Sequence, residues 1–340
     1  MEALIIENPG QVGFGAAAMP ELRPDEILLR VDVVGFCGSD LSTFRGLNPL
    51  VSYPRIPGHE IAAVVEAQGA EVPADVFPTG MGVTVLPYTA CGVCPACRRG
   101  RVNTCRSNET LGVQRDGSLT RWIAVPWGKV VPTGSLSPHQ AALVEPLSVG
   151  FHAVGRAAVA PEDRVVVIGC GAVGLGAVAG AARRKATVIA VDVDDRKLEL
   201  ARRAGADHLV NSRQTALHAR LEELTGGDGP DVVIEAVGLP ETFVAAVSEV
   251  SFAGRVVYIG YSKAPVSYDT AQFVKKELDI RGSRNATRDD FEAVIEMLGN
   301  ADFPVDEAVT RIVPFAEAGD ALRAWDADPG SVTRIHVKLG

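Results

Sequence analysis

The chain has 340 residues, of which 47% are hydrophobic and 22% are charged, a composition typical of a soluble globular protein with two domains. Its net charge of −9 argues against general affinity for nucleic acid or for an anionic membrane surface. The first residues lack a basic segment followed by an apolar core, and no apolar run is long and charge-free enough to span a bilayer. We therefore expect a cytoplasmic protein.

Residues 1 to about 150 are predicted to be rich in strands and loops. Residues 26–36 form a predicted strand that ends at Cys37, and His59 follows some way along the chain. A thiolate and an imidazole are ligand types that zinc favours. The two residues are too far apart for a local zinc-finger spacing, so each taken by itself favours the other interpretation, a buried core thiol at Cys37 and an ordinary polar histidine at His59.

Four of the six cysteines form a C-x2-C-x2-C-x7-C cluster made of Cys91, Cys94, Cys97 and Cys105. Four thiolates in one loop close a tetrahedral shell, which indicates a structural zinc site. An iron–sulfur cluster is the alternative, and it is disfavoured because the last gap is long and no second cluster follows. Four unrelated thiols are a further alternative.

Glu145 stands directly before Pro146 and a predicted helix at 148–160. A lone glutamate in such a place is usually a solvated helix or loop residue. Pro146 could instead fix the backbone so that the carboxylate points inward. The sequence leaves both interpretations open.

Residues 164–192 carry the pattern of a dinucleotide-binding βαβ unit. A predicted buried strand at 164–168 is followed by a glycine turn and a helix that extends to Arg184. A second predicted strand at 187–191 ends at Asp192, which would accept hydrogen bonds from the adenosine ribose. The residues expected to surround the pyrophosphate are Gly169, Gly171, Ala172, Val173 and Gly174.

The α/β alternation continues to about residue 285, with predicted strands near 210, at 230–238, at 254–260 and at 278–285. Ligands bind beyond the carboxyl ends of strands in such sheets. Cofactor contacts are therefore expected from Val237, Gly238 and Ile259. Arg284 is a candidate cofactor contact or a surface arginine at about equal weight. A helix at 289–298 and a closing strand at 333–338 complete the predicted elements.

Taken together, these motifs resemble the zinc-dependent members of the medium-chain dehydrogenase/reductase superfamily, on the polyol and sugar dehydrogenase side. The resemblance extends almost from end to end and is carried by Cys37–Asp40, Gly58–Glu60, the four-cysteine cluster, Glu145–Leu147 and Gly169–Gly174 with Asp192. It implies an α/β fold with two domains. A GroES-like catalytic domain would comprise residues 1–152 and 286–340, and a Rossmann domain with a doubly wound parallel sheet residues 153–285.

The resemblance also implies a catalytic zinc held by Cys37, His59 and Glu145, with water or substrate at the fourth position. Glu145 takes the place of a cysteine found in alcohol dehydrogenases, as in polyol dehydrogenases. Asp40 would orient His59, and Glu60 is an alternate ligand.

Two serines would serve the reacting hydroxyl. Ser39 would contact the substrate hydroxyl. Ser42 stands where the family often has a histidine at the outer end of a proton relay, so the proton must leave through Ser42 with water or through another group.

From these residues we expect a zinc- and NAD-dependent dehydrogenase that converts a secondary alcohol into a ketone. A polyol or sugar acid is the expected substrate, with Arg45 and Asn48 as candidate contacts; Arg45 is alternatively a solvated loop residue. The alternatives are an amino-alcohol dehydrogenase of the threonine type, a zinc-free quinone reductase, or a non-catalytic nucleotide-binding protein. A homodimer or homotetramer is expected, with no nucleic-acid or membrane partner.

Overall fold

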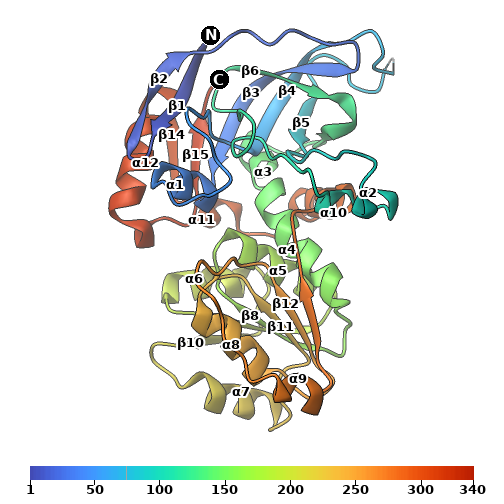
Figure 1. Cartoon of the computed structure of the whole chain (residues 1–340), viewed down its shortest axis with the longest axis vertical. Helices are drawn as coiled ribbons and strands as arrows, with labels where there is room; N and C mark the ends of the chain where they lie inside the picture. Colours follow the sequence, from blue (N-terminus) through green and yellow to red (C-terminus); the bar gives the residue numbers. More distant parts are fainter. Residues whose placement is uncertain (74) are drawn as a thin grey trace. The chain divides into compact units, whose positions relative to one another are not determined.

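The computed structural model describes residues 1–73 and 75–340, and the chain divides into two compact units (Figure 1). Unit 1 contains Met1–Glu145, Thr287–Ala301 and Val305–Gly340, and unit 2 contains Pro146–Ala286 and Asp302–Pro304. The chain thus leaves unit 1 and returns to it. The first division falls at 145/146, seven residues before the expected boundary at 152/153. The second falls at 286/287, one residue after the expected boundary at 285/286.

Unit 1 is built on a seven-stranded sheet with the order β14-β15-β3-β4-β5-β7, in which β6 also pairs with β3. The central strand β3 covers Glu26–Phe36, the range that the sequence predicts, because its apolar residues alternate toward a buried face. The other strands of the unit, including the separate β1-β2 pair, are β1 (Glu2–Asn8), β2 (Gln11–Ala16), β4 (Glu60–Gln68), β5 (Gly82–Val85), β6 (Trp122–Pro126), β7 (Val130–Pro132), β14 (Arg311–Pro314) and β15 (Ile335–Lys338).

Short helices and single turns cover this sheet and form its connections. Residues that fill the core beneath them include Leu4, Ile27, Phe36 and Ile61. The helices are α1 (Gly38–Phe44), α2 (Pro95–Arg98), α3 (Pro138–Ala142), α10 (Arg288–Gly299), α11 (Val305–Ala308) and α12 (Ala318–Ala327), with 3-10 turns η1 (Val102–Thr104), η2 (Trp127–Lys129), η3 (Phe315–Glu317) and η4 (Pro329–Ser331).

Unit 2 is built on a six-stranded parallel sheet with the order β10-β9-β8-β11-β12-β13. This order reverses direction between β8 and β11, which is the doubly wound arrangement, and it confirms the expected fold class. The strands are β8 (Arg164–Ile168), β9 (Thr187–Asp192), β10 (His208–Asn211), β11 (Val232–Glu235), β12 (Arg255–Tyr258) and β13 (Asp279–Gly282). The helices are α5 (Ala172–Arg183), α6 (Asp195–Arg203), α7 (Leu217–Thr225), α8 (Pro240–Glu249) and α9 (Ala271–Lys275).

Helix α4 (Val144–Ala157) begins four residues before the predicted helix at 148–160. Glu145 therefore lies in the first turn of this helix rather than ahead of it. Its side chain is buried, so the inward orientation is the one that the structure has. Pro146 is tolerated here because a first-turn residue needs no intrahelical partner for its nitrogen.

None of the helices formed by the described residues combines the length and the apolar character needed to cross a membrane.

Two histidines from distant parts of unit 1 stack on each other. The rings of His139 in α3 and His336 in β15 are 5.3 Å apart and nearly parallel, with 3.0 Å between their Nδ1 atoms. His336 is fully buried, and its Nε2 atom has no hydrogen-bond partner. Burial, with Arg334 and His139 nearby, lowers the pKa of His336 to about 3, and burial also lowers the pKa of His139.

We predict that this pair makes unit 1 sensitive to acid. The unfolded chain takes up a proton on His336 near pH 6.5, whereas the folded chain resists it down to about pH 3. The stabilisation that comes from keeping His336 neutral is therefore fully present above pH 6.5. Below that pH the free energy of unfolding falls by up to about 1.4 kcal/mol per pH unit. Urea unfolding at pH 7.5 and 5.0 measures this loss. The variant His336→Gln should lose about 2 kcal/mol less than the unmodified chain.

His208→Gln, in β10 of unit 2, controls for the removal of a histidine as such. Equal losses in the unmodified chain and in His336→Gln would contradict the prediction.

Candidate active site and metal centres

The pairing of β3 with β4 brings Cys37 and His59 together. In this antiparallel pair Gly35 lies opposite Glu60, so the end of one strand meets the start of the other. Cys37 follows β3 as the N-cap of α1, and His59 immediately precedes β4. Their separation in the sequence is therefore closed by the register of one sheet.

The donor atoms of Cys37, His59 and Glu60 all lie within 4.8 Å of one another, which makes this trio a potential metal site. We call it the open set. Glu145, the expected third ligand, is not part of the trio. It accepts a hydrogen bond from the phenol of Tyr88 through Oε1 instead. In this structure, then, the alternate ligand Glu60 occupies the place beside Cys37 and His59.

Asp40 fixes the backbone on both sides of this set. Its carboxylate accepts the N–H of Cys37 at 2.8 Å and the N–H of Gly58 at 3.2 Å. Asp40 is fully buried, and burial raises its pKa although these bonds and the charge of His59 oppose the rise. The residue thus holds the turn after β3 to the turn before β4.

The open set is suited to a cation. Buried polar atoms without a hydrogen-bond partner in the described chain include His59 Nδ1, Glu60 Oε2 and Ser39 Oγ. Burial alone lowers the pKa of His59, but Cys37, Asp40 and Glu145 together raise it well above its usual value. Because the surroundings favour positive charge so strongly, a thiolate, an imidazole and a carboxylate here fit zinc.

A second charged residue reaches the open set from the far end of the chain. Arg334 forms a buried ion pair with Glu60 and donates to the carbonyl oxygen of Phe36 at 3.0 Å. Burial, opposed by Arg334 and reinforced by Glu145, raises the pKa of Glu60 to about 7. Arg334 binds one carboxylate oxygen of Glu60 and leaves the other without a partner.

The four cysteines of the predicted cluster converge, with their sulfur atoms within 4.8 Å of one another. The Sγ of Cys94 lies 3.5 Å from that of Cys97 and 4.0 Å from that of Cys105, and the N–H of Cys91 points at the Cys105 sulfur. Hydrogen bonds lower the pKa of Cys94 to about 6, and the largest contribution comes from the backbone N–H of Arg106. This arrangement fits a closed structural zinc site.

In unit 2 the glycine turn adopts the expected shape. Gly169 has φ of +96°, and Gly171 is the N-cap of α5. A Cβ on Gly174 would lie 1.8 Å from the carbonyl oxygen of Gly169, whereas a Cβ on Gly171 would meet nothing within 4 Å. Helix and strand therefore pack closely at Gly174, and the space beside Gly171 is open to a pyrophosphate.

Asp192 ends β9, as predicted, and its carboxylate is held by the backbone. It accepts the N–H groups of Cys170 at 2.7 Å, Val193 at 2.7 Å and Asp194 at 3.1 Å. These bonds fix the acid beside the glycine turn. Its contact with the ribose stays a prediction.

Val237 and Gly238 follow β11, and their N–H groups donate to Glu235 at 2.8 and 2.7 Å. Glu235 is fully buried, and sequence analysis missed it. Its position at the carboxyl end of a buried strand was the available signal. Ile259 follows the adjacent β12, so these residues lie at the edge where ligands bind, and half-buried Arg284 lies just after β13.

The candidate substrate contacts in unit 1 have partners within the chain. Arg45 forms an ion pair with Asp326 of α12, at 2.5 Å from Nε to Oδ1, and also donates to its carbonyl oxygen at 3.0 Å. Asn48 donates to Thr43 at 3.3 Å. Ser42 is half-buried within α1. A role for Arg45 in substrate binding would require this ion pair to be shared or opened.

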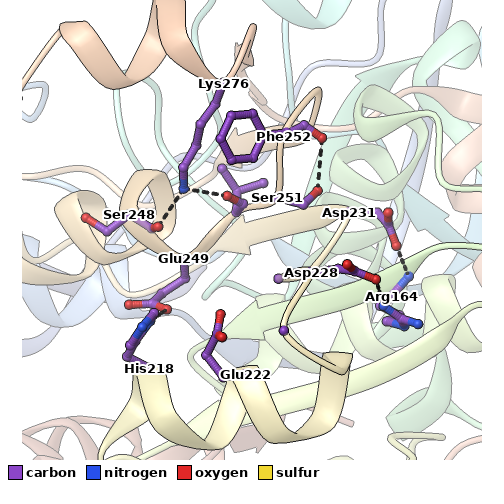
Figure 2. A pocket seen from close by; sticks show the side chains of 13 residues that line it. Arg164, His218, Glu222, Asp228, Asp231, Ser248, Glu249, Ser251, Phe252 and Lys276 are labelled. Atoms are coloured by element: carbon purple, nitrogen blue, oxygen red, sulfur yellow. Dashed lines mark hydrogen bonds and ion pairs between the residues drawn. The ribbon is translucent and has the colours of Figure 1, made fainter.

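Figure 2 shows a groove of about 520 Å³ in unit 2. It lies at the start of β8, whereas the glycine turn follows the end of that strand. Arg164 at the start of β8 and Asp231 before β11 line it, so it faces the amino ends of the strands. Its polar groups bond among themselves, with His218 on Glu249 and Lys276 on the carbonyl oxygens of Ser248 and Val250. This groove is not where a doubly wound sheet binds its ligand.

Comparison of the chain with known proteins identifies its family. Residues 23–135 match the alcohol dehydrogenase GroES-like domain and residues 172–300 match the zinc-binding dehydrogenase domain. The chain is 34% identical over 316 residues to L-galactonate-5-dehydrogenase of Escherichia coli, covering 93% of this chain and 92% of that protein. The chain belongs to the zinc-type alcohol dehydrogenases.

Other members of the zinc-type alcohol dehydrogenase family are similarly close. Sorbitol dehydrogenase of Bacillus subtilis is 34% identical over 290 residues, covering 83% of this chain and 81% of that protein. The structure of the Escherichia coli alcohol dehydrogenase rspB in complex with NADH superimposes with a TM-score of 0.91 at 30% identity, covering 100% of this chain and 99% of that chain. The chain is thus a zinc- and NAD(H)-type dehydrogenase by family.

We predict two zinc ions per chain with different roles. Cys105→Ser opens the closed set and should lower the melting temperature together with the loss of about one zinc. His59→Ala should also lose about one zinc but keep the fold and abolish turnover, because the open set serves the chemistry. Metal analysis, thermal unfolding and NADH formation measure these outcomes.

Cys170→Ser is the matched control, since Cys170 is a buried cysteine outside both donor sets, and this variant should keep both ions. At most one zinc in a fully loaded, active preparation would disprove the assignment.

Proposed function

We propose that this dehydrogenase oxidises a secondary hydroxyl of a polyol or sugar acid to a ketone, with NAD as the hydride acceptor. The observation that carries the proposal is the open set of Cys37, His59 and Glu60, with unpartnered buried atoms, in a chain that also has a complete dinucleotide turn. A zinc ion held there supplies Lewis acidity, which lowers the pKa of a nearby alcohol.

The chain's own residues position the substrate and carry the proton. Ser39 Oγ is buried and without a partner next to the open set, so it is available to the reacting hydroxyl. Ser42 lies one turn further along α1 and is half-buried, which suits transfer of the proton to water. The substrate loses a proton from oxygen and a hydride from carbon, and the hydride reduces the nicotinamide ring.

The substrate class follows from the relatives. Those at 31–34% identity include L-galactonate-5-dehydrogenase, sorbitol dehydrogenase, erythritol/L-threitol dehydrogenase and L-idonate 5-dehydrogenase. All four names denote polyol or sugar-acid substrates. Together with a carboxylate in the open set, they support a polyhydroxylated substrate rather than a simple aliphatic alcohol.

We also propose that the chain forms a homodimer or homotetramer in the cytoplasm. Strand β13 is a terminal strand of the parallel sheet, and its residues are mostly exposed. The edge of such a strand carries backbone groups that a second copy can pair with.

We predict a preference for NAD over NADP of at least about tenfold in kcat/KM. The carboxylate of Asp192 suits a ribose diol and repels a 2′-phosphate. Asp192→Ser should reduce the ratio of kcat/KM with NAD to kcat/KM with NADP. The carboxylate of Asp195 accepts hydrogen bonds from Asn211 and Gln214, so Asp195→Ser should leave this ratio unchanged. Steady-state kinetics with both cofactors measures the ratio, and a higher value with NADP would refute the assignment.

We predict higher kcat/KM for polyols and sugar acids than for straight-chain primary alcohols. A panel of both classes with NAD, followed by the absorbance of NADH, measures the order. Faster turnover of a primary aliphatic alcohol than of every polyhydroxylated compound would overturn the proposed substrate class.

Arg45 separates the two substrate types within this panel. If its guanidinium grips a carboxylate, Arg45→Ala should cost about 1.5–3 kcal/mol in kcat/KM for a sugar acid and far less for the matching polyol. Asp326→Ala removes only the partner of Arg45 and is the control for loss of the ion pair. Equal losses on both substrates would exclude the carboxylate contact.

A further inference from the structure

Two buried carboxylates adjoin the open set, and only one of them belongs to it. Glu60 is fully buried and lies within the set, whereas Glu145 is 5% exposed and lies outside it. Glu145 interacts electrostatically with both His59 and Glu60, so it lies near enough to the set to compete for a cation held there.

Glu60 and Glu145 are held by different groups. Arg334 binds Glu60 through one carboxylate oxygen only and leaves Oε2 without a partner. Glu145, by contrast, accepts the hydroxyl of Tyr88 on Oε1. Tyr88 is itself buried, so its hydroxyl is directed at Glu145 rather than at solvent.

Tyr88 lies at the base of the segment that carries the four-cysteine cluster, residues 90–108, which we call the lobe. Residues 87–89 and 109–111, which flank this segment, run side by side, and we call them the lobe neck. The N–H of Leu111 donates to Pro87 at 3.0 Å, and Thr89 and Glu109 exchange bonds of 2.9 and 2.7 Å. Tyr88 itself pairs with Thr110 across the neck. The lobe neck thus fixes the backbone of Tyr88, and the hydroxyl of Tyr88 bonds to Glu145 beside the open set.

We propose that Tyr88 is a positioning residue that holds Glu145 out of the open set and so leaves Glu60 as the carboxylate that faces the metal. The inference rests on the proposed function, since it assigns a metal to the open set. A carboxylate oxygen that accepts a hydrogen bond from a fixed donor is both oriented and partly neutralised, so it competes poorly for a cation. Through this phenol the four-cysteine lobe influences the open set.

The test replaces Tyr88 by phenylalanine, which removes the hydroxyl and keeps the ring. Cobalt(II) is exchanged into the open set, with one cobalt and one zinc per chain verified by metal analysis. The visible absorption is then measured without substrate. Tyr88→Phe frees Glu145 to bind the metal in addition to Glu60, which Arg334 still holds in place. The coordination number should therefore rise and the absorption should weaken at least about twofold, since four-coordinate sites absorb more strongly. kcat should fall by about 10–100-fold with an unchanged KM for NAD.

The same measurement in a Glu145→Gln background gives the decisive comparison. Glu145→Gln alone should retain the cobalt, and adding Tyr88→Phe should then change nothing, because Tyr88 acts through Glu145. Tyr268→Phe removes the hydroxyl of a tyrosine in unit 2 and controls for the substitution itself.

Three results would overturn the proposal. They are an unchanged spectrum in Tyr88→Phe, an equal change in the Glu145→Gln background, and loss of the open-set metal in Glu145→Gln alone. The spectrum is read without substrate, so a failure of the proposed substrate class leaves the spectral result standing, and the two can fail separately.

Discussion

The two hydrogen bonds that Asp40 accepts from the backbone are the constraint on which the rest of unit 1 depends. A fully buried carboxylate pays a large desolvation cost unless its oxygens are satisfied. Those of Asp40 take the N–H groups of Cys37 and Gly58, so the turn after β3 and the turn before β4 must close on it together. The same carboxylate therefore holds both of the turns that carry the candidate ligands Cys37 and His59. Removing the side chain would release both turns at once.

The discontinuous course of unit 1 follows from the same site. Glu60 needs a cation beside it, and Arg334 provides one from the segment that returns after unit 2. The fit leaves no spare room, because a Cβ on Gly35 would lie 2.1 Å from the second oxygen of Glu60. Strand β15 carries this segment against β3, so the last strand of the chain completes a site begun by the first long one.

Local patterns predicted the elements, and long-range pairing decided the site. The strands at 26–36 and 164–168 were exact because their apolar residues alternate or run uninterrupted, and the four cysteines were evident from their spacing. The roles of Tyr88 and Arg334 were invisible, because each depends on a partner set by tertiary packing. The position of Glu145 could not be predicted for the same reason, because it depends on the hydrogen bond from Tyr88. The same reason applies to Arg45, whose partner Asp326 arrives from a distant helix.

The charge balance explains why the two cysteine-containing sites differ. The closed set consists of four sulfurs and receives backbone N–H groups, so one cation completes it and leaves no position for a reactant. Three carboxyl groups, those of Asp40, Glu60 and Glu145, lie at the open set, and Arg334 pairs with Glu60. These surroundings favour positive charge, as the raised pKa of His59 shows. A divalent ion held by Cys37, His59 and Glu60 would supply that charge, and three protein ligands would leave a position for an alcohol oxygen.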